Sequence, residues 1–67
     1  MAKLSKTDRR AVLKAVDAGW YMDTDIFRAY ASRLPARLGQ LAWDCLTVLD
    51  DEPWRNFGDV LNEVLDY

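Results

Sequence analysis

"PARLGQLAWDCLTVLD", residues 35–50, is the stretch that decides the fold. Its apolar residues recur every three or four positions, a spacing that places side chains on one face of an α-helix. Pro35 suits the first turn of such a helix, and Trp43 lies well off its apolar face. The stretch therefore predicts a helix over residues 35–50 with a buried face made of Leu38, Leu41, Ala42, Cys45, Val48 and Leu49.

The N-terminal part of the chain predicts a first helix over residues 5–18. The Ser5 hydroxyl can cap the amides at its start, and Gly19 is a natural residue to end it. Its apolar face consists of Val12, Leu13, Val16 and Trp20.

A second helix is predicted over residues 24–33, with Asp23 or Thr24 as its cap. It should end ahead of Pro35, because the residue before a proline is pushed out of the helical region. Its apolar face consists of Ile26, Phe27, Tyr30, Ala31 and Leu34.

The last predicted helix covers residues 54–66 and starts near Pro53 or Asn56. Asp51 and Glu52 are expected just ahead of it, where negative charge favours the positive end of the helix dipole. Its apolar face consists of Phe57, Val60, Leu61, Val64 and Leu65.

Four helices with short connections predict an all-α protein, a compact bundle of four short helices with no sheet. The chain has 67 residues and is expected to form a single helical domain, residues 1–67. A domain of this size buries only about 60% of the surface that its unfolded chain exposes. Its 51% of hydrophobic residues suffices for a monomer, and a homodimer would enlarge the core.

The cysteine count and the N-terminus predict a cytoplasmic protein. Cys45 is the only cysteine, which excludes a disulfide within the monomer and favours a reducing compartment. The segment "MAKLSKTDRRAVLKAV" carries charges where a signal peptide has an unbroken apolar run. No stretch approaches the roughly 18 apolar residues of a membrane span.

The residues available for chemistry argue against an enzyme. The chain has no histidine, the most usual general base at neutral pH. Cys45 lies within an apolar face, where cysteine acts as a small core residue. Asp50, Asp51 and Glu52 lack the spacing of a calcium loop, and their place ahead of a helix explains them. We therefore expect no catalytic residue, no metal and no cofactor.

Charge is distributed unevenly along the chain. Residues 1–43 hold eight basic and four acidic residues, a net charge of +4. Residues 44–67 hold one basic and seven acidic residues, a net charge of −6. Two explanations are open: the halves attract each other within the fold, or one half meets a charged partner.

Aromatic and acidic residues form the predicted partner-binding set. Trp43 is either an anchor at an interface or packed against the first helix or the N-terminal segment. The acidic stripe of the last helix either steers a basic partner toward the protein or serves solubility. The predicted partner-binding residues are Trp43, Asp44, Asp51, Glu52, Trp54, Arg55, Asp59, Glu63 and Asp66.

The alternative is a small helical DNA- or RNA-binding regulator that uses the basic first half. The second and third helices loosely suggest a helix-turn-helix, but the outward face of the third helix would turn Asp44 and Asp50 toward phosphates. The connection "SRLPARLG" also differs from the short glycine turn of that motif. The candidate nucleic-acid-binding residues are Lys6, Arg10, Lys14, Arg33 and Arg37.

In size, charge and lack of catalytic groups, the chain is similar to the short proteins that phages and mobile elements encode to disable a host machine, anti-CRISPR proteins among them. The resemblance is one of type and covers no particular residues. It implies an inhibitor that occupies a surface of another protein. We therefore expect a non-enzymatic protein-binding module, with the nucleic-acid-binding regulator as the alternative.

Overall fold

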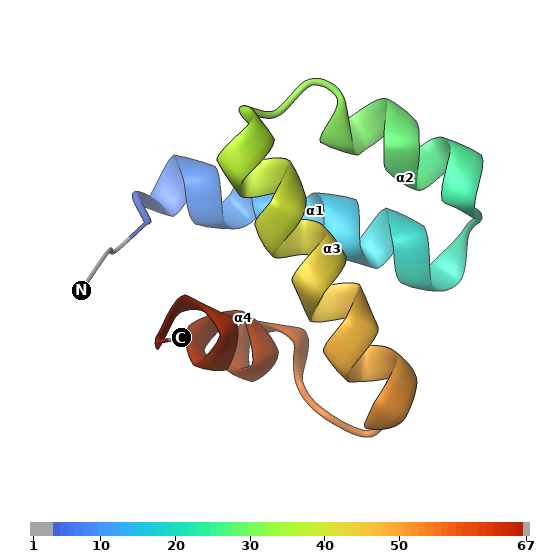
Figure 1. Cartoon of the computed structure of the whole chain (residues 1–67), viewed down its shortest axis with the longest axis vertical. Coiled ribbons are helices and arrows are strands. Elements are labelled where there is room, and N and C mark those ends of the chain that lie inside the picture. The colour runs from blue at the N-terminus through green and yellow to red at the C-terminus, as the bar shows by residue number, and fades with distance from the viewer. Residues whose placement is uncertain (1–3, 67) are drawn as a thin grey trace.

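A computed structural model describes residues 4–66 and confirms the all-α bundle. Its helices are α1 (Lys6–Tyr21), α2 (Thr24–Ala31), α3 (Ala36–Asp51) and α4 (Phe57–Asp66). α1 and α2 lie side by side in opposite directions, α3 crosses α1, and α4 packs against α3 (Figure 1). The Cα atoms extend over 31 × 27 × 16 Å, so the shortest dimension holds about two layers of helices. Each helix consequently keeps one face exposed.

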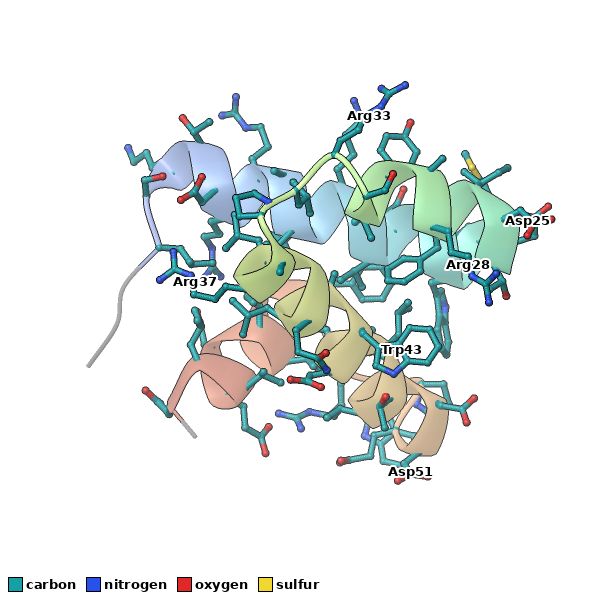
Figure 2. All side chains as sticks on the ribbon, turned by 45° about the horizontal axis from the view of Figure 1, so that its top comes forward. Asp25, Arg28, Arg33, Arg37, Trp43 and Asp51 are labelled. Atoms are coloured by element: carbon teal, nitrogen blue, oxygen red, sulfur yellow. The ribbon has the colours of Figure 1, made fainter. Side chains whose placement is uncertain are left out.

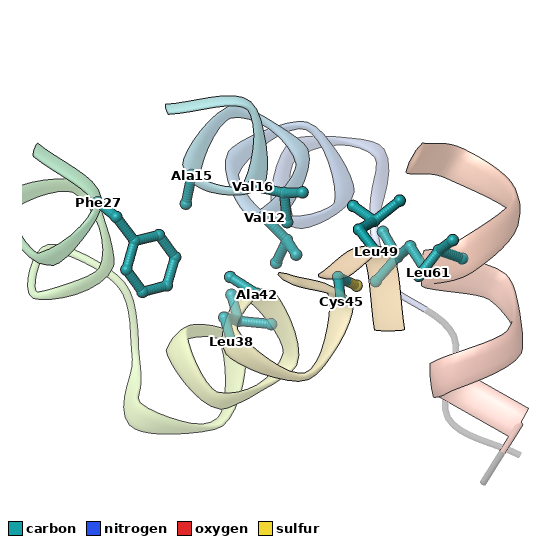
Figure 3. Packing of buried hydrophobic residues seen from close by; sticks show 10 residues of the cluster. Val12, Ala15, Val16, Phe27, Leu38, Ala42, Cys45, Leu49 and Leu61 are labelled. Carbon is teal, nitrogen blue, oxygen red and sulfur yellow. The ribbon is translucent and has the colours of Figure 1, made fainter. Parts of the chain in front are cut away.

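The core lies where the apolar faces of the helices meet (Figure 3). α2 contributes one buried residue, Phe27, at one end of the core, while Leu49 and Leu61 pack together where α3 meets α4. The predicted apolar faces therefore point inward, except that Ile26, predicted on the buried face of the second helix, is exposed near the start of α2. The buried residues of the cluster are Val12, Ala15, Val16, Phe27, Leu38, Ala42, Cys45, Leu49, Val60 and Leu61.

Side-chain oxygens cap three of the four helix starts, which satisfies amides that the helices leave unpaired. Ser5 Oγ accepts a hydrogen bond of 3.1 Å from the amide three residues later, as predicted. Asp23, rather than Thr24, caps α2 in the same way at 2.9 Å. Asn56 Oδ1 accepts from the amides two and three residues later, at 2.8 and 3.2 Å. α3 has no side-chain cap and begins directly after Pro35.

The prediction that the first helix ends at residue 18 is wrong, because Gly19 lies within α1. The helix continues to Tyr21. A Cβ at position 19 would lie 2.6 Å from Leu46 Cδ1 and 3.0 Å from Phe27 Cδ1. Glycine at this position therefore permits close approach of α2 and α3 to α1, and it does not act as a helix stop.

Alanine is expected to have opposite effects at two helical glycines. Gly19→Ala forces Leu46 and the Phe27 ring to move, and should lower the free energy of unfolding by about 1 kcal/mol despite the better helix propensity of alanine. At Gly39 the atom nearest to a Cβ is the Ala31 carbonyl oxygen at 3.4 Å. Gly39→Ala should therefore stabilise the protein by about 0.5–1 kcal/mol. Urea unfolding followed by circular dichroism measures both, and a stabilising Gly19→Ala would contradict the packing role of that glycine.

The boundaries of α2 and α3 also differ from the predicted ones. α2 ends at Ala31, two residues earlier than predicted, because the backbone hydrogen bonds that follow span three residues instead of four. The amides of Arg33 and Leu34 donate to carbonyls three residues back, at 3.2 and 3.0 Å. Pro35 lies just outside α3 instead of in its first turn, and α3 extends to Asp51.

α4 begins at Phe57, three residues later than predicted. Residues 52–56 form the turn between α3 and α4. Asp51 is therefore the last residue of α3 and Glu52 its C-terminal cap, so both lie where negative charge is unfavourable to the helix dipole, and not at the start of α4. The start shifts because Asn56 supplies a side-chain cap, which Pro53 cannot.

Candidate functional site

Arg55 joins two other predicted partner-binding residues, Glu52 and Glu63, in one cluster of charges. Its guanidinium pairs with Glu63 of α4 and lies 3.7 Å from the Glu52 carboxylate. The hydrogen bond to Glu63 raises the pKa of Arg55 above its ordinary value. The three side chains thus satisfy one another and fasten the α3–α4 turn to α4.

The other predicted residues on this side of the molecule are exposed. Asp59 lies in the first turn of α4, where its charge favours the helix dipole, and Asp66 is the last residue of that helix. Trp54, in the α3–α4 turn, is 77% exposed. Within residues 4–66 its ring contacts no other aromatic ring. These residues lie apart from Trp43, whose ring packs on α2.

Trp43 is partly packed and partly exposed. Its side chain is 51% exposed, and its ring centroid lies 5.7 Å from that of Phe27, with the ring planes inclined by 41°. Phe27 itself is buried. Trp43 therefore rests on the edge of the core, and the contact is with α2, which the sequence analysis did not predict.

The outward side of α3 around Trp43 is polar and mainly acidic. Figure 2 shows Arg28 of α2 and Trp43 on one side of the molecule, with Asp51 farther along α3. Gln40 Nε2 donates to Asp44 Oδ1 at 3.0 Å, which orients that carboxylate. Three carboxylates and one guanidinium make this surface negatively charged. We call it the Trp43 face, and it consists of Arg28, Gln40, Trp43, Asp44, Thr47, Asp50 and Asp51.

Exposed apolar side chains also occur near the α1–α2 connection, and none of them belongs to the predicted binding sets. Tyr21 is 72% exposed, Met22 59% and Ile26 37%. The Tyr21 ring lies 6.0 Å from the ring of Phe57 in α4, centroid to centroid. Sequence reasoning missed Tyr21 because an expected helix end at Gly19 assigned it to a connector with no defined face.

Lys6, Arg10 and Lys14 of the alternative set share one face of α1. This face, the α3–α4 turn and the start of α4 line an open groove of about 950 Å³, which we call the α1 groove. Asp17 is the one carboxylate residue among the described residues that line it. The cationic residues of the groove are Lys6, Arg9, Arg10, Lys14 and Arg55.

The structure separates Arg33 and Arg37 from these three cations. Arg33 lies in the turn after α2 and Arg37 in the first turn of α3, and neither lines the α1 groove (Figure 2). Lys14 marks the side of the groove nearest α2, because its Nζ lies 5.6 Å from the centroid of the Tyr30 ring. The alternative set therefore does not form one surface.

Arg9 is a groove residue that the sequence analysis did not single out. Its guanidinium donates to Asn62 Oδ1 at 2.7 Å and to the Gly58 carbonyl oxygen at 3.2 Å, which ties α1 to α4. Both acceptors are neutral, so Arg9 keeps its net positive charge in the groove. A spacing of more than 50 residues between Arg9 and Asn62 left no sequence signal for this contact.

The opposite charges of the two halves of the chain are not paired directly. Both ion pairs within residues 4–66 involve Arg55 and acids of its own half. The hydrogen bonds from Arg9 that cross between the halves end on neutral groups. In the described part of the chain, no ion pair between the halves therefore neutralises the basic residues of the first half or the acidic residues of the second.

Cys45 is a core residue. Burial, with a contribution from the carboxylate of Asp44, raises the pKa of its thiol from 9.0 to about 11. Such a thiol remains protonated at neutral pH and is a poor nucleophile. Within residues 4–66, no group of three or more His, Cys, Asp or Glu residues is placed to hold a metal ion. None of the helices described there is long and apolar enough to cross a membrane.

Fold and surfaces define a small all-α protein with an acidic face on α3 and a basic groove along α1. Comparison with protein-family models, with curated proteins and with solved structures finds no match for the chain. The function proposed below therefore rests on the residues of the chain itself.

Proposed function

We propose that the chain is a non-enzymatic protein-binding module that inserts Trp43 into a basic surface of a partner protein. The observation that carries this proposal is the position of Trp43, half-exposed while its ring is held against the buried ring of Phe27. Tryptophan is enriched among the residues that dominate binding energy at interfaces. A fixed, exposed tryptophan is suited to that role.

The support from Phe27 favours Trp43 over the other exposed tryptophan as the anchor. A side chain that is already ordered loses less conformational entropy when a partner covers it. Trp54 is 77% exposed in a turn and has no such ring contact among the described residues. Both tryptophans belong to the predicted set, but Trp43 should contribute more binding energy.

The charge of the Trp43 face specifies a basic partner. Asp44, Asp50 and Asp51 form no ion pair within residues 4–66, and Arg28 is the single cation of the face. Carboxylates around an apolar anchor accelerate the encounter with a positively charged surface and suppress binding to acidic ones. Glu52 and Glu63 contribute less to this steering, because Arg55 neutralises them.

Occupation of a basic surface makes inhibition the proposed consequence of binding. A basic protein surface commonly serves an anionic ligand such as nucleic acid. A protein seated there competes with that ligand by steric exclusion and by charge. This mode of action matches the resemblance to phage and mobile-element inhibitors, and it requires no catalytic group.

The proposal is tested by capture from extracts of the source cell with the immobilised wild-type protein, Trp43→Ala and Trp54→Ala. We expect a basic protein that wild type and Trp54→Ala retain and Trp43→Ala loses. With that protein purified, calorimetry should show a Kd at least about 30-fold higher for Trp43→Ala, equivalent to about 2 kcal/mol. An equal loss for Trp54→Ala, or no capture that depends on Trp43, would contradict the proposal.

A matched pair of charge reversals tests which acids steer the partner. Asp50→Lys with Asp51→Lys alters the Trp43 face, and Asp59→Lys with Asp66→Lys makes the same change of charge on α4. The association rate should fall about tenfold or more for the α3 pair and much less for the α4 pair. Circular dichroism checks that both variants remain folded. A larger effect of the α4 pair would contradict the assignment to α3 and indicate that the partner binds α4.

A further inference from the structure

The cations of the α1 groove keep most of their charge. Lys6, Arg10 and Lys14 form no ion pair within residues 4–66, and Arg9 is bonded to neutral oxygen atoms. Arg55, the fifth cation, is neutralised by Glu63 and Glu52 and therefore adds no net positive charge to the groove. Four cations in one groove with a single carboxylate make it a site for an extended anion.

The spacing of the cations indicates a linear ligand. Lys6, Arg10 and Lys14 follow one another at intervals of one helical turn, about 6 Å each, along the length of α1. The N-terminus of α4 lines the groove too, but Asn56 already accepts from its first amides. Side-chain cations in a row, rather than a helix N-terminus, therefore define this site.

An exposed tyrosine stands on the same face of α1. Tyr21 also lines the groove, 72% exposed, and its ring lies 6.0 Å from that of Phe57. A cationic track combined with an exposed aromatic ring is the arrangement by which proteins bind single-stranded nucleic acid, the cations contacting phosphates and the ring stacking on a base. An acidic peptide would use the cations but gain little from Tyr21.

We propose that the α1 groove binds a single strand of nucleic acid, with Lys6, Arg9, Arg10 and Lys14 on its phosphates and Tyr21 stacked on a base. The distance along α1 from Lys6 to Tyr21 is about 22 Å, which corresponds to about six stacked nucleotides. This function goes beyond the proposed protein binding. The groove shares no residue with the Trp43 face, so either can fail without the other.

Fluorescence anisotropy with labelled oligo(dT) of about 12 nucleotides tests the proposal. With four phosphate contacts, affinity should fall about 50-fold between roughly 50 and 200 mM salt. Affinity should rise with oligonucleotide length up to about six nucleotides and then change little. No binding at the lower salt concentration would overturn the proposal.

Matched triple variants locate the site. Lys6→Gln, Arg10→Gln and Lys14→Gln together should weaken binding at least about tenfold and reduce the salt dependence to about a quarter. Arg28→Gln, Arg33→Gln and Arg37→Gln together change the net charge equally but should preserve most of the salt dependence. Equal losses in both variants would show non-specific attraction and overturn the assignment to the groove.

Aromatic variants and competing ligands test the identity of the occupant. Tyr21→Ala should lower the affinity about tenfold, Tyr21→Trp should retain it, and Trp54→Ala should change it less than about twofold. A duplex of equal length and a poly-glutamate peptide should both bind more weakly than the single strand. Tighter binding of the duplex or of the peptide would overturn the assignment to a single strand.

Discussion

Replacing Leu49 with alanine is expected to lower the free energy of unfolding by about 3 kcal/mol, among the largest effects of any single substitution in this protein. Leu49 is fully buried, and it packs beside Leu61 where α3 meets α4 (Figure 3). Truncation removes its apolar contacts and leaves a cavity that the surrounding helices can fill only in part. A domain of this size has only a few kcal/mol of stability in total, so the variant should be substantially unfolded near 37 °C.

Urea unfolding followed by circular dichroism and tryptophan fluorescence measures this loss. Leu13→Ala is the matched control, because Leu13 is only partly buried on the groove side of α1. It should lose about 1 kcal/mol or less. A loss for Leu49→Ala no larger than that of Leu13→Ala would show that the C-terminal half of α3 is not part of the core.

Periodicity was sufficient to predict the four helices, because each buries a single apolar stripe. Val12 and Val16 of α1, or Val60 and Leu61 of α4, are inward at positions that the 3.6-residue period dictates. Capping is equally local, since a side-chain oxygen needs only its own helix start, and Ser5 was identified correctly. Features that depend on a few neighbouring residues are thus visible in the sequence.

Helix ends were predicted less well where tertiary contacts decide them. Glycine favours helix ends in general, but Gly19 is needed inside α1 because Leu46 and Phe27 occupy the space that a Cβ would need. The start of α4 at Phe57 has a local reason instead, the side-chain cap provided by Asn56. The sequence allows Gly19 either to end a helix or to permit close packing within one, and the tertiary contacts select the second role.

The candidate site depends even more on long-range contacts. Arg55 was expected to face a partner, but the fold brings Glu63 against it, eight positions along the chain. Trp43 gains its support from Phe27 on another helix. Arg9 becomes part of a groove only because α4 folds back onto α1. No spacing rule within one helix predicts such pairings.

The net charge of −2 conceals two surfaces of opposite sign. An acidic chain would ordinarily argue against binding to nucleic acid, because the phosphate backbone repels negative charge. Here, however, the acids of the Trp43 face and the cations of the α1 groove lie on different helices and do not pair within residues 4–66. Binding is governed by the local potential at each surface, so the overall charge excludes neither kind of partner.

The stability of the protein is expected to fall as the pH rises from about 9 to 11, because of Cys45. Burial raises the pKa of this thiol from 9.0 to about 11 in the folded protein. Well below pH 9 the thiol is protonated in both states and its ionisation has no effect on stability. Above it, the unfolded chain releases the proton while the folded protein retains it, which favours unfolding. A difference of two pKa units corresponds to a loss of about 2 to 3 kcal/mol once the pH exceeds 11.

The variant Cys45→Ala isolates the contribution of the thiol from every other effect of pH on stability. Cys45→Ala should be less stable than wild type at neutral pH, because the smaller side chain leaves a cavity. The stability of the variant should, however, depend less on pH. At about pH 10.5 the wild-type protein should have lost about 2 kcal/mol more than the variant, measured by urea unfolding. Parallel curves for the two proteins from pH 8 to 10.5 would mean that the thiol ionises as readily in the folded protein as in the unfolded chain. That result would contradict the placement of Cys45 in the core, because burial there is the main cause that keeps the thiol protonated.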